Sequence, residues 1–297
     1  MGTIRMEIRL VLDYDVAAPG ADFIFNVHAA HTTSQRLVNE TLEVSQPVAS
    51  TLHTDPATGN RTLRIRADPG RLGLAYAVTV DLVHHRIDPA LLEEVPLHRL
   101  PPEVLSYLYP SRYCQSDRLV KLATNRFGQL QRGYQRVQAI RDWVHDHVTF
   151  TSSSSNSHTS AIDTLIEQVG VCRDFAHLMI ALCRAVNIPA RYATGTDYGA
   201  DPQLGPPDFQ AYVEVFLGER WYIFDPSGTA IPMGFVRFAT GRDAADAAFA
   251  TIFGDVRSTA PGIRYVAVED PSLGYVLPHL CSDALSTAGV GRHAAGG

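Results

Sequence analysis

Cysteine is scarce in this sequence, and the few copies are scattered. The 297 residues contain only Cys114, Cys172, Cys183 and Cys281, with no Cys-x-x-Cys pair and no histidine at metal-ligand spacing. This spacing argues against a zinc site. Four cysteines in a chain of this length, without an export signal, also argue against a disulfide framework. We therefore expect no metal, no cofactor and free thiols, at least three of which act only as small packing residues.

Long apolar runs and blocks of like charge are also missing. No stretch approaches the roughly 18 apolar residues that a spanning helix needs, and the N-terminal segment lacks the unbroken apolar core of a signal peptide. A net charge of −6, without a basic run, gives no electrostatic footprint for nucleic acid or an anionic membrane. The sequence predicts a globular cytoplasmic protein with neither of these partners, and no pattern indicates its oligomeric state.

The spacing of apolar residues changes along the chain. Up to residue 87, short apolar–polar alternations separated by turn signals such as DPATGN predict strands. Later segments such as YQRVQAIRDWVHDHV have apolar residues every three or four positions and predict helices. We predict an α+β protein with a β-sandwich-like domain in residues 1–95, a core domain in 96–270 and a tail in 271–297. The final segment LSTAGVGRHAAGG has no apolar period and is predicted to be disordered.

The segment GVCRDFAHL places Cys172 at the start of a predicted helix. Apolar residues follow it at helical spacing, and Asn187 and Pro189 end the run, so we predict a buried helix over residues 172–186. Free N–H groups and the positive end of the helix dipole favour an anion in the first turn and can lower a thiol pKa. Placement alone leaves two interpretations open, a nucleophile or a small core residue.

No histidine close in the sequence is a good base for Cys172. His177 lies five residues further on, which is roughly 140° around the helix and about 7.5 Å along it. His145 and His147 lie at the end of an amphipathic helix and are better explained as solvated residues. His158 follows the serine run TSSSSNS, which predicts a loop.

The segment DFQAYVEVFLGERWYIFDPSG has the pattern of a β-hairpin. With Gly218 and Glu219 as its turn, paired residues have numbers that sum to 437. Asp225 then faces Tyr212, and Gln210 lies diagonally from Asp225, within side-chain reach. A nucleophile at a helix start and a polar pair on a hairpin have the geometry of a cysteine–base–acid triad.

These two segments together resemble the transglutaminase-like superfamily, in its bacterial cysteine-protease type. The motif Gly-x-Cys-x-Asp-Phe-Ala is matched over residues 170–176, and an aromatic strand that ends in Asp-Pro is matched over residues 224–226. The resemblance covers roughly residues 100–257 and implies a papain-like core of helices and antiparallel sheet after a β-rich domain. It implies a Cys–His–Asp triad in which Cys172 is the nucleophile and Asp225 the acid.

The histidine position of this triad holds glutamine. The family's middle motif, Asp-Phe-His-Ala, reads DFQA here and ends at Ala211, so that Gln210 takes the place of the base. The resemblance implies that Cys172 attacks a carboxamide or peptide carbonyl of a peptide or protein substrate. Gln210 cannot titrate near neutral pH, so proton return to the leaving amine should be impaired.

Four interpretations of Gln210 stay open at this point. The protein is a cysteine hydrolase or acyl transferase with a substitute base such as His158, or it is a pseudoenzyme that binds a peptide or protein segment without turnover. Alternatively, the glutamine is an introduced replacement for histidine, or the reaction cleaves a thioester, whose leaving group needs no proton. The sequence does not distinguish hydrolysis from transamidation.

Overall fold

The computed structural model describes residues 2–289 and contains helices and mainly antiparallel strands. The helices are α1 (Ser116–Phe127), α2 (Tyr134–His147), α3 (Ala161–Glu167), α4 (Cys172–Ala185) and α5 (Ala244–Ala247), with short 3-10 turns η1 (Pro89–Leu91), η2 (Leu97–Arg99), η3 (Pro102–Leu108), η4 (Pro202–Leu204) and η5 (Pro232–Gly234). The strands are β1 (Ile4–Val16), β2 (Ala21–Phe25), β3 (Gln35–Val44), β4 (Ser50–Thr54), β5 (Arg61–Ala67), β6 (Gly70–Leu82), β7 (His85–Ile87), β8 (Thr149–Phe150), β9 (Val169–Gly170), β10 (Ala190–Thr196), β11 (Phe209–Leu217), β12 (Arg220–Phe224), β13 (Arg237–Gly241), β14 (Ala250–Phe253), β15 (Val256–Ser258), β16 (Gly262–Val268) and β17 (Ala284–Gly289).

The described chain divides into two compact units. Unit 1 contains the chain up to Val83, with Ala193–Ala211 and Gly228–Leu280. Unit 2 contains His84–Tyr192, Tyr212–Ser227 and the chain from Cys281. The three-part division predicted from the sequence, into residues 1–95, 96–270 and 271–297, stays a prediction.

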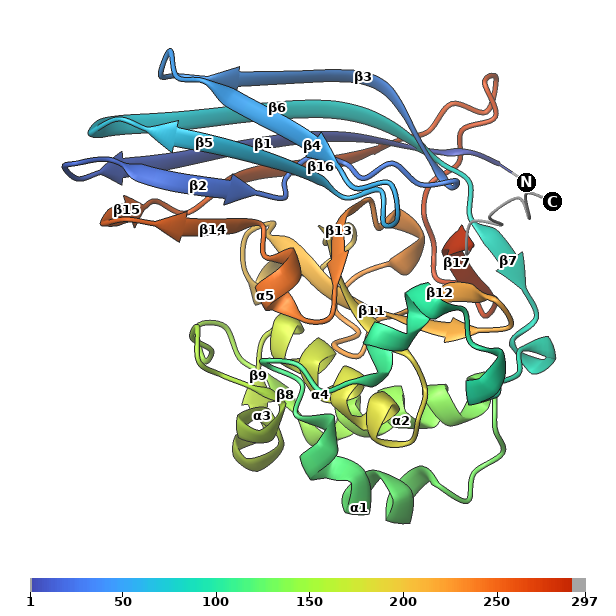
Figure 1. The fold of residues 1–297 in the computed structure, drawn as a ribbon. Coiled ribbons are helices and arrows are strands. Elements are labelled where there is room, and N and C mark those ends of the chain that lie inside the picture. The colour runs from blue at the N-terminus through green and yellow to red at the C-terminus, as the bar shows by residue number, and fades with distance from the viewer. Residues whose placement is uncertain (1, 290–297) are drawn as a thin grey trace, which may run out of the picture. The chain divides into compact units, whose positions relative to one another are not determined.

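Unit 1 is built on a β-sandwich. One sheet has the strand order β15-β1-β6-β3, with β16 also paired to β1, and the other has the order β14-β2-β5-β4 (Figure 1). Side chains alternate along β1, so that Met6 and Leu10 are fully buried while Arg9 is exposed. The ring of Tyr14 on β1 lies 5.1 Å from that of Phe23 on β2, which joins the two sheets through their inner faces. The predicted α+β class with a β-sandwich-like domain is confirmed.

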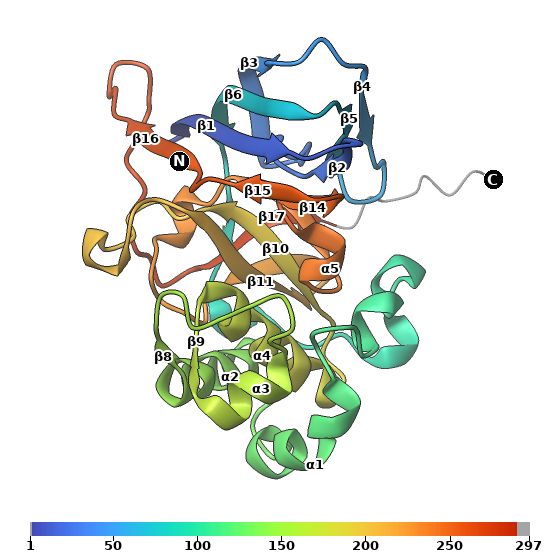
Figure 2. The ribbon, with the colours of Figure 1, turned by 90° about the vertical axis from the view of Figure 1, so that its left-hand side faces the viewer.

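Unit 2 surrounds helix α4. This helix packs against α1, α2 and α3 (Figure 2), and Leu178, Met179 and Leu182 on it are fully buried. Its bounds, Cys172–Ala185, agree with the helix predicted over residues 172–186. The serine run before it forms a loop, as predicted, and a short parallel pair, β8 and β9, leads into its first turn. Helix α4 is therefore fixed along its length, and Cys172 lies at the end where the chain enters it.

The β11–β12 hairpin has the predicted register. Its pairs run from Val213↔Phe224 to Leu217↔Arg220, and every pair sums to 437. Gly218 and Glu219 have φ values of 49° and 71°. Positive φ at both positions is typical of a type I′ turn, whose twist matches that of the two strands.

The C-terminal segment differs from the prediction of disorder from Leu285 onward. Residues 284–289 form β17, which pairs with β12 on one side and with β7 on the other. Ser286 and Thr287 are fully buried, although the strand has little apolar character of its own. Its two neighbours supply the hydrogen bonds and the burial that the local sequence does not indicate. The rest of the segment lies outside the described residues.

No helix in the described part of the chain is both long enough and apolar enough to cross a membrane.

Candidate functional site

Cys172 is the first residue of α4 and is partly exposed. The chain reaches it through β9, and Val171 is the residue at the helix cap. A Cβ atom on Gly170 would lie 2.8 Å from the Cβ atom of Asp174, so a larger residue at 170 would displace the first turn of the helix. The glycine of the motif therefore has a steric role, which is to let β9 pass close to α4.

Asp174 holds this turn in place. Its side chain is fully buried; Oδ2 accepts a hydrogen bond from the Val171 N–H at 2.9 Å, and Oδ1 accepts one from the Ser155 hydroxyl at 2.8 Å. Arg173 also contacts the Asp174 carboxylate, at 3.3 Å. One carboxylate thus joins the start of α4, which carries Cys172, to the serine loop.

Replacing Asp174 by alanine should lower both the stability of the protein and the reactivity of Cys172. The loss of the cap and of the buried hydrogen bonds is expected to cost about 2–3 kcal/mol in the free energy of unfolding, measured by urea denaturation. The same variant should react more slowly with iodoacetamide at Cys172, because the turn that holds the thiol loosens.

The matched control for this experiment is Asp163→Ala. Asp163 makes the equivalent cap on α3, where it accepts hydrogen bonds from the Ser160 N–H at 2.9 Å and the Ser160 hydroxyl at 2.7 Å. Its loss should reduce stability but leave the alkylation rate of Cys172 unchanged. Equal alkylation rates in Asp174→Ala and the parent would contradict the role of Asp174 at the thiol.

His177, the nearest histidine to Cys172 in the sequence, is unsuited to act as its base. His177 is fully buried, with its ring stacked on that of Tyr113 at 5.0 Å and 5.2 Å from that of Tyr192. This burial, with the nearby Arg173 and Arg184 charges, holds the pKa of His177 well below its usual value, so the ring stays neutral. His158 is exposed on the serine loop, where its backbone N–H donates to Asn156. Its role as a substitute base stays a prediction.

Asp225 lies directly after β12 and is buried, with 6% of its surface exposed. Its Oδ1 atom accepts hydrogen bonds from the Ser227 N–H at 3.0 Å and from the Ser227 hydroxyl at 2.6 Å. The backbone carbonyl of Asp225 accepts a hydrogen bond from Arg141 Nε at 2.8 Å. Both its side chain and its backbone are therefore held in a fixed position.

Gln210 is the second residue of β11 and is also buried, with 3% of its surface exposed. Its Nε2 atom donates a long hydrogen bond to the Thr229 hydroxyl, at 3.4 Å. The unit boundary crosses β11 after Ala211, so Gln210 belongs to unit 1 while Cys172 and Asp225 belong to unit 2. Their assignment to one site stays a prediction.

The loop that precedes Gln210 carries two carboxyl groups with raised pKa values. The Asp208 N–H donates to the Asp197 carboxylate at 2.9 Å, and the Tyr265 hydroxyl donates to the Asp208 carbonyl at 3.3 Å, so the two ends of the loop meet. Burial, together with the Asp208 charge, raises the pKa of Asp197 to about 6, and burial also raises the pKa of Asp208. No sequence pattern marks this pair, because the raised pKa values depend on burial in the folded chain.

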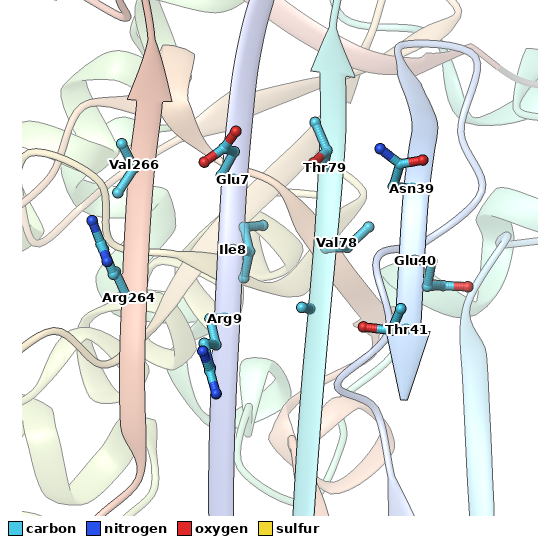
Figure 3. A pocket seen from close by; sticks show the side chains of 11 residues that line it. Glu7, Ile8, Arg9, Asn39, Glu40, Thr41, Val78, Thr79, Arg264 and Val266 are labelled. Atoms are coloured by element: carbon cyan, nitrogen blue, oxygen red, sulfur yellow. The ribbon is translucent and has the colours of Figure 1, made fainter. Parts of the chain in front are cut away.

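A separate hollow of about 320 Å³ lies on the outer face of the sandwich, over β1, β3, β6 and β16 (Figure 3). Arg9 and Arg264 lie opposite each other on β1 and β16, and Glu7, Asn39 and Thr79 complete much of its lining. No cysteine or histidine lines this hollow. It contains none of the residues that the sequence predicts to be functional.

The remaining cysteines differ from Cys172 in their surroundings. Cys114 and Cys183 are fully buried, and burial raises the pKa of the Cys183 thiol far above its usual value, which keeps it protonated. Cys281 is partly exposed, and its thiol contacts the Asp283 carbonyl at 3.8 Å. Within residues 2–289, no group of three or more histidine, cysteine, aspartate or glutamate side chains is arranged to hold a metal ion.

Two family models match the chain. A model of the transglutaminase-like superfamily matches residues 121–226, and a model of the bacterial transglutaminase N-terminal domain matches residues 4–103. The first range includes Cys172, Gln210 and Asp225.

A solved structure is similar over nearly the whole chain. The crystal structure described as a "Putative Cysteine Protease from Cytophaga hutchinsonii" is 40% identical, with a TM-score of 0.88, and the match covers 96% of this chain and 98% of that chain.

The curated relatives match over shorter regions. An uncharacterized protein of Mycobacterium leprae is 27% identical over 146 residues, which is 48% of this chain and 52% of that protein. An uncharacterized protein of Mycobacterium tuberculosis is 30% identical over 124 residues, which is 37% of this chain and 40% of that protein. The chain thus spans about half the length, or less, of these curated relatives.

Proposed function

The chain belongs to the transglutaminase-like superfamily, and from this we propose that it is a cysteine hydrolase or acyl transferase by descent. Cys172 would attack a carboxamide or peptide carbonyl of a peptide or protein substrate and form a thioester. Asp225 would hold the family's acid position, and Gln210 the position of its histidine. No nucleic acid, membrane, metal or cofactor has a part in this proposal, and its cytoplasmic location stays a prediction.

The observation that carries the proposal is the placement of Cys172. Cys172 lies in the first turn of a 14-residue helix and is partly exposed, whereas Cys183 of the same helix and Cys114 before α1 are fully buried. The positive end of the helix dipole stabilises a negative charge at this position. A partly exposed thiol at a helix start is the environment in which reactive cysteines occur.

Turnover by this site should be slow, because attack by the thiolate needs no base but the later proton transfers do. The helix start supports a thiolate without help from a base. Release of an amine requires a proton, and hydrolysis of the thioester requires removal of a proton from water. A glutamine side chain does neither. We therefore propose that both steps are slow for an amide. An activated ester, whose leaving group needs no proton, should acylate Cys172 more readily than the resulting thioester is hydrolysed.

The proposal is tested by alkylation of Cys172 with iodoacetamide across pH, followed by mass spectrometry of the peptide that contains it. Cys281, partly exposed but outside any helix, is an internal reference in the same sample. We expect Cys172 to react with a midpoint below about 8.5, the usual thiol value, and faster than Cys281 at neutral pH. A profile for Cys172 like that of a free cysteine would contradict the proposal.

Gln210 supports a second function, a pseudoenzyme that binds a peptide or protein segment without turnover. The amide is buried and hydrogen-bonded to Thr229, so it is an ordered part of the structure rather than a solvated side chain. Replacement of Gln210 by histidine distinguishes the two functions. An enzyme that lacks only its base should gain turnover, whereas a binding protein should not.

A further inference from the structure

Helix α2 contacts the segment that carries Asp225 at three successive residues. The ring of Tyr134 lies 4.8 Å from the ring of Phe224. Arg141 Nε donates to the Asp225 carbonyl at 2.8 Å, and His145 Nδ1 lies 3.3 Å from the Pro226 carbonyl. All of these residues belong to unit 2.

The spacing on α2 explains how one helix makes all three contacts. Residues 134, 141 and 145 differ by seven and four, so their side chains lie along one face of the helix. Residues 224–226 lie at the end of β12, where the strand's own pairing stops at Phe224. The carbonyls of Asp225 and Pro226 lie just beyond this end and contact Arg141 and His145 on α2.

The direction of the His145 contact follows from its acceptor. A carbonyl oxygen only accepts, so the hydrogen on the His145 ring must lie on Nδ1. His145 is exposed at the end of α2, as the sequence predicts. The sequence does not predict its contact with the Pro226 carbonyl. No sequence motif marks Arg141 either, because its partner is a backbone atom 84 residues away.

We propose that Arg141 and His145 are positioning residues that hold the backbone at Asp225 and so fix the position of its carboxylate. This inference rests on the proposed function, in which Asp225 holds the acid position. Ser227 holds the Asp225 carboxylate through two hydrogen bonds to Oδ1. Helix α2 holds the main chain at Asp225 through Arg141. Misplacement of a catalytic group by about 1 Å can cost about 10²-fold in rate, so small shifts of this backbone should affect catalysis.

The test uses the Gln210→His protein, in which a histidine at the base position makes the role of Asp225 measurable. In that background we compare Arg141→Met, His145→Leu and His145→Asn. The control is Arg132→Met, at an exposed arginine just before α2 that makes no ion pair in the described part of the chain. The readouts are kcat and KM for a p-nitrophenyl ester and the pH midpoint of Cys172 alkylation.

We expect Arg141→Met and His145→Leu to lower kcat by about 10- to 100-fold with KM unchanged. They should also raise the alkylation midpoint by about one pH unit, because a displaced carboxylate no longer supports the imidazolium beside the thiolate. His145→Asn should recover most of the activity, since its amide can donate to the same carbonyl. Arg132→Met should behave as the background does.

The outcomes separate this inference from the proposed function. If Asp225→Asn slows the Gln210→His protein while Arg141→Met and His145→Leu leave its kcat and alkylation profile unchanged, the positioning role is wrong and the proposed function stands. The positioning role is also wrong if all variants, including Arg132→Met, lose activity equally. If Gln210→His shows no activity that depends on Cys172 and Asp225, both proposals fail.

Discussion

Replacement of Gln210 by histidine is expected to raise the hydrolysis of an ester or anilide substrate by about 10²- to 10⁴-fold, the usual contribution of positioned acid–base catalysis. Gln210 is buried on β11, so the new ring would enter an ordered site rather than solvent. Imidazole titrates near neutral pH and can both protonate a leaving amine and deprotonate water, which an amide cannot do. The gain should be larger for an anilide than for an activated ester, whose leaving group needs no proton.

The measurement is the steady-state rate of release of p-nitroaniline or p-nitrophenol, with Gln210→Asn as the matched control. Asparagine also lacks a titrating group, so this control should stay at the parent rate. Cys172→Ala in the Gln210→His protein should abolish the gain. An unchanged rate in a folded Gln210→His protein would favour the binding function over the enzymatic one.

Replacement of Glu214 by alanine is expected to lower the free energy of unfolding by about 3–5 kcal/mol, because it leaves a buried charge without its partner. Glu214 on β11 is fully buried, and its carboxylate pairs with Arg191 at 2.5 Å and accepts a hydrogen bond from the Thr287 hydroxyl at 2.8 Å. The Arg191 guanidinium also stacks 4.1 Å above the ring of Trp221. This pair joins strands β10, β11 and β17 next to the hairpin that leads to Asp225.

Urea denaturation measures this loss, and a double variant provides the control. Arg191→Met with Glu214→Leu removes both charges and replaces them with apolar groups, so it should cost less than Glu214→Ala alone. A loss below about 1 kcal/mol in Glu214→Ala, the range of exposed ion pairs, would show that Arg191 reaches solvent when its partner is removed.

Local patterns in the sequence were sufficient for the parts of the fold that form from neighbouring residues. Helix α4 follows from apolar spacing and a proline stop, and the hairpin register follows from two turn residues with positive φ. Both signals lie within about 20 residues of sequence, where the geometry of one element determines which side chains share a face.

The parts that the sequence did not predict depend on contacts between distant segments. Strand β17 has weak strand character and forms because β12 and β7 lie on either side of it. Strand β16 pairs with β1 at the other end of the chain, with Arg264 opposite Arg9. A period of two indicates a strand but does not specify its partner.

The residues of the candidate site also divide into those that a local motif predicts and those that depend on distant contacts. Motif matches identified Cys172 and Asp225 because each lies within a short motif of the superfamily. They identified Gln210 because it replaces the histidine of such a motif. Arg141 and His145 act on backbone carbonyls, which any residue at 225 or 226 would provide. A contact to a backbone carbonyl does not require a particular residue type at the acceptor position, so no sequence motif predicts it.

If Cys172 is a nucleophile whose turnover is limited by Gln210, an acyl group should accumulate on its sulfur and can be detected there. The protein is mixed with p-nitrophenyl acetate, the burst of p-nitrophenolate is recorded, and the quenched protein is digested for mass spectrometry. We expect a burst of one equivalent, slow turnover afterwards and an acetyl group on the peptide that contains Cys172. No burst, or an acetyl group only on other residues, would contradict this role of Cys172.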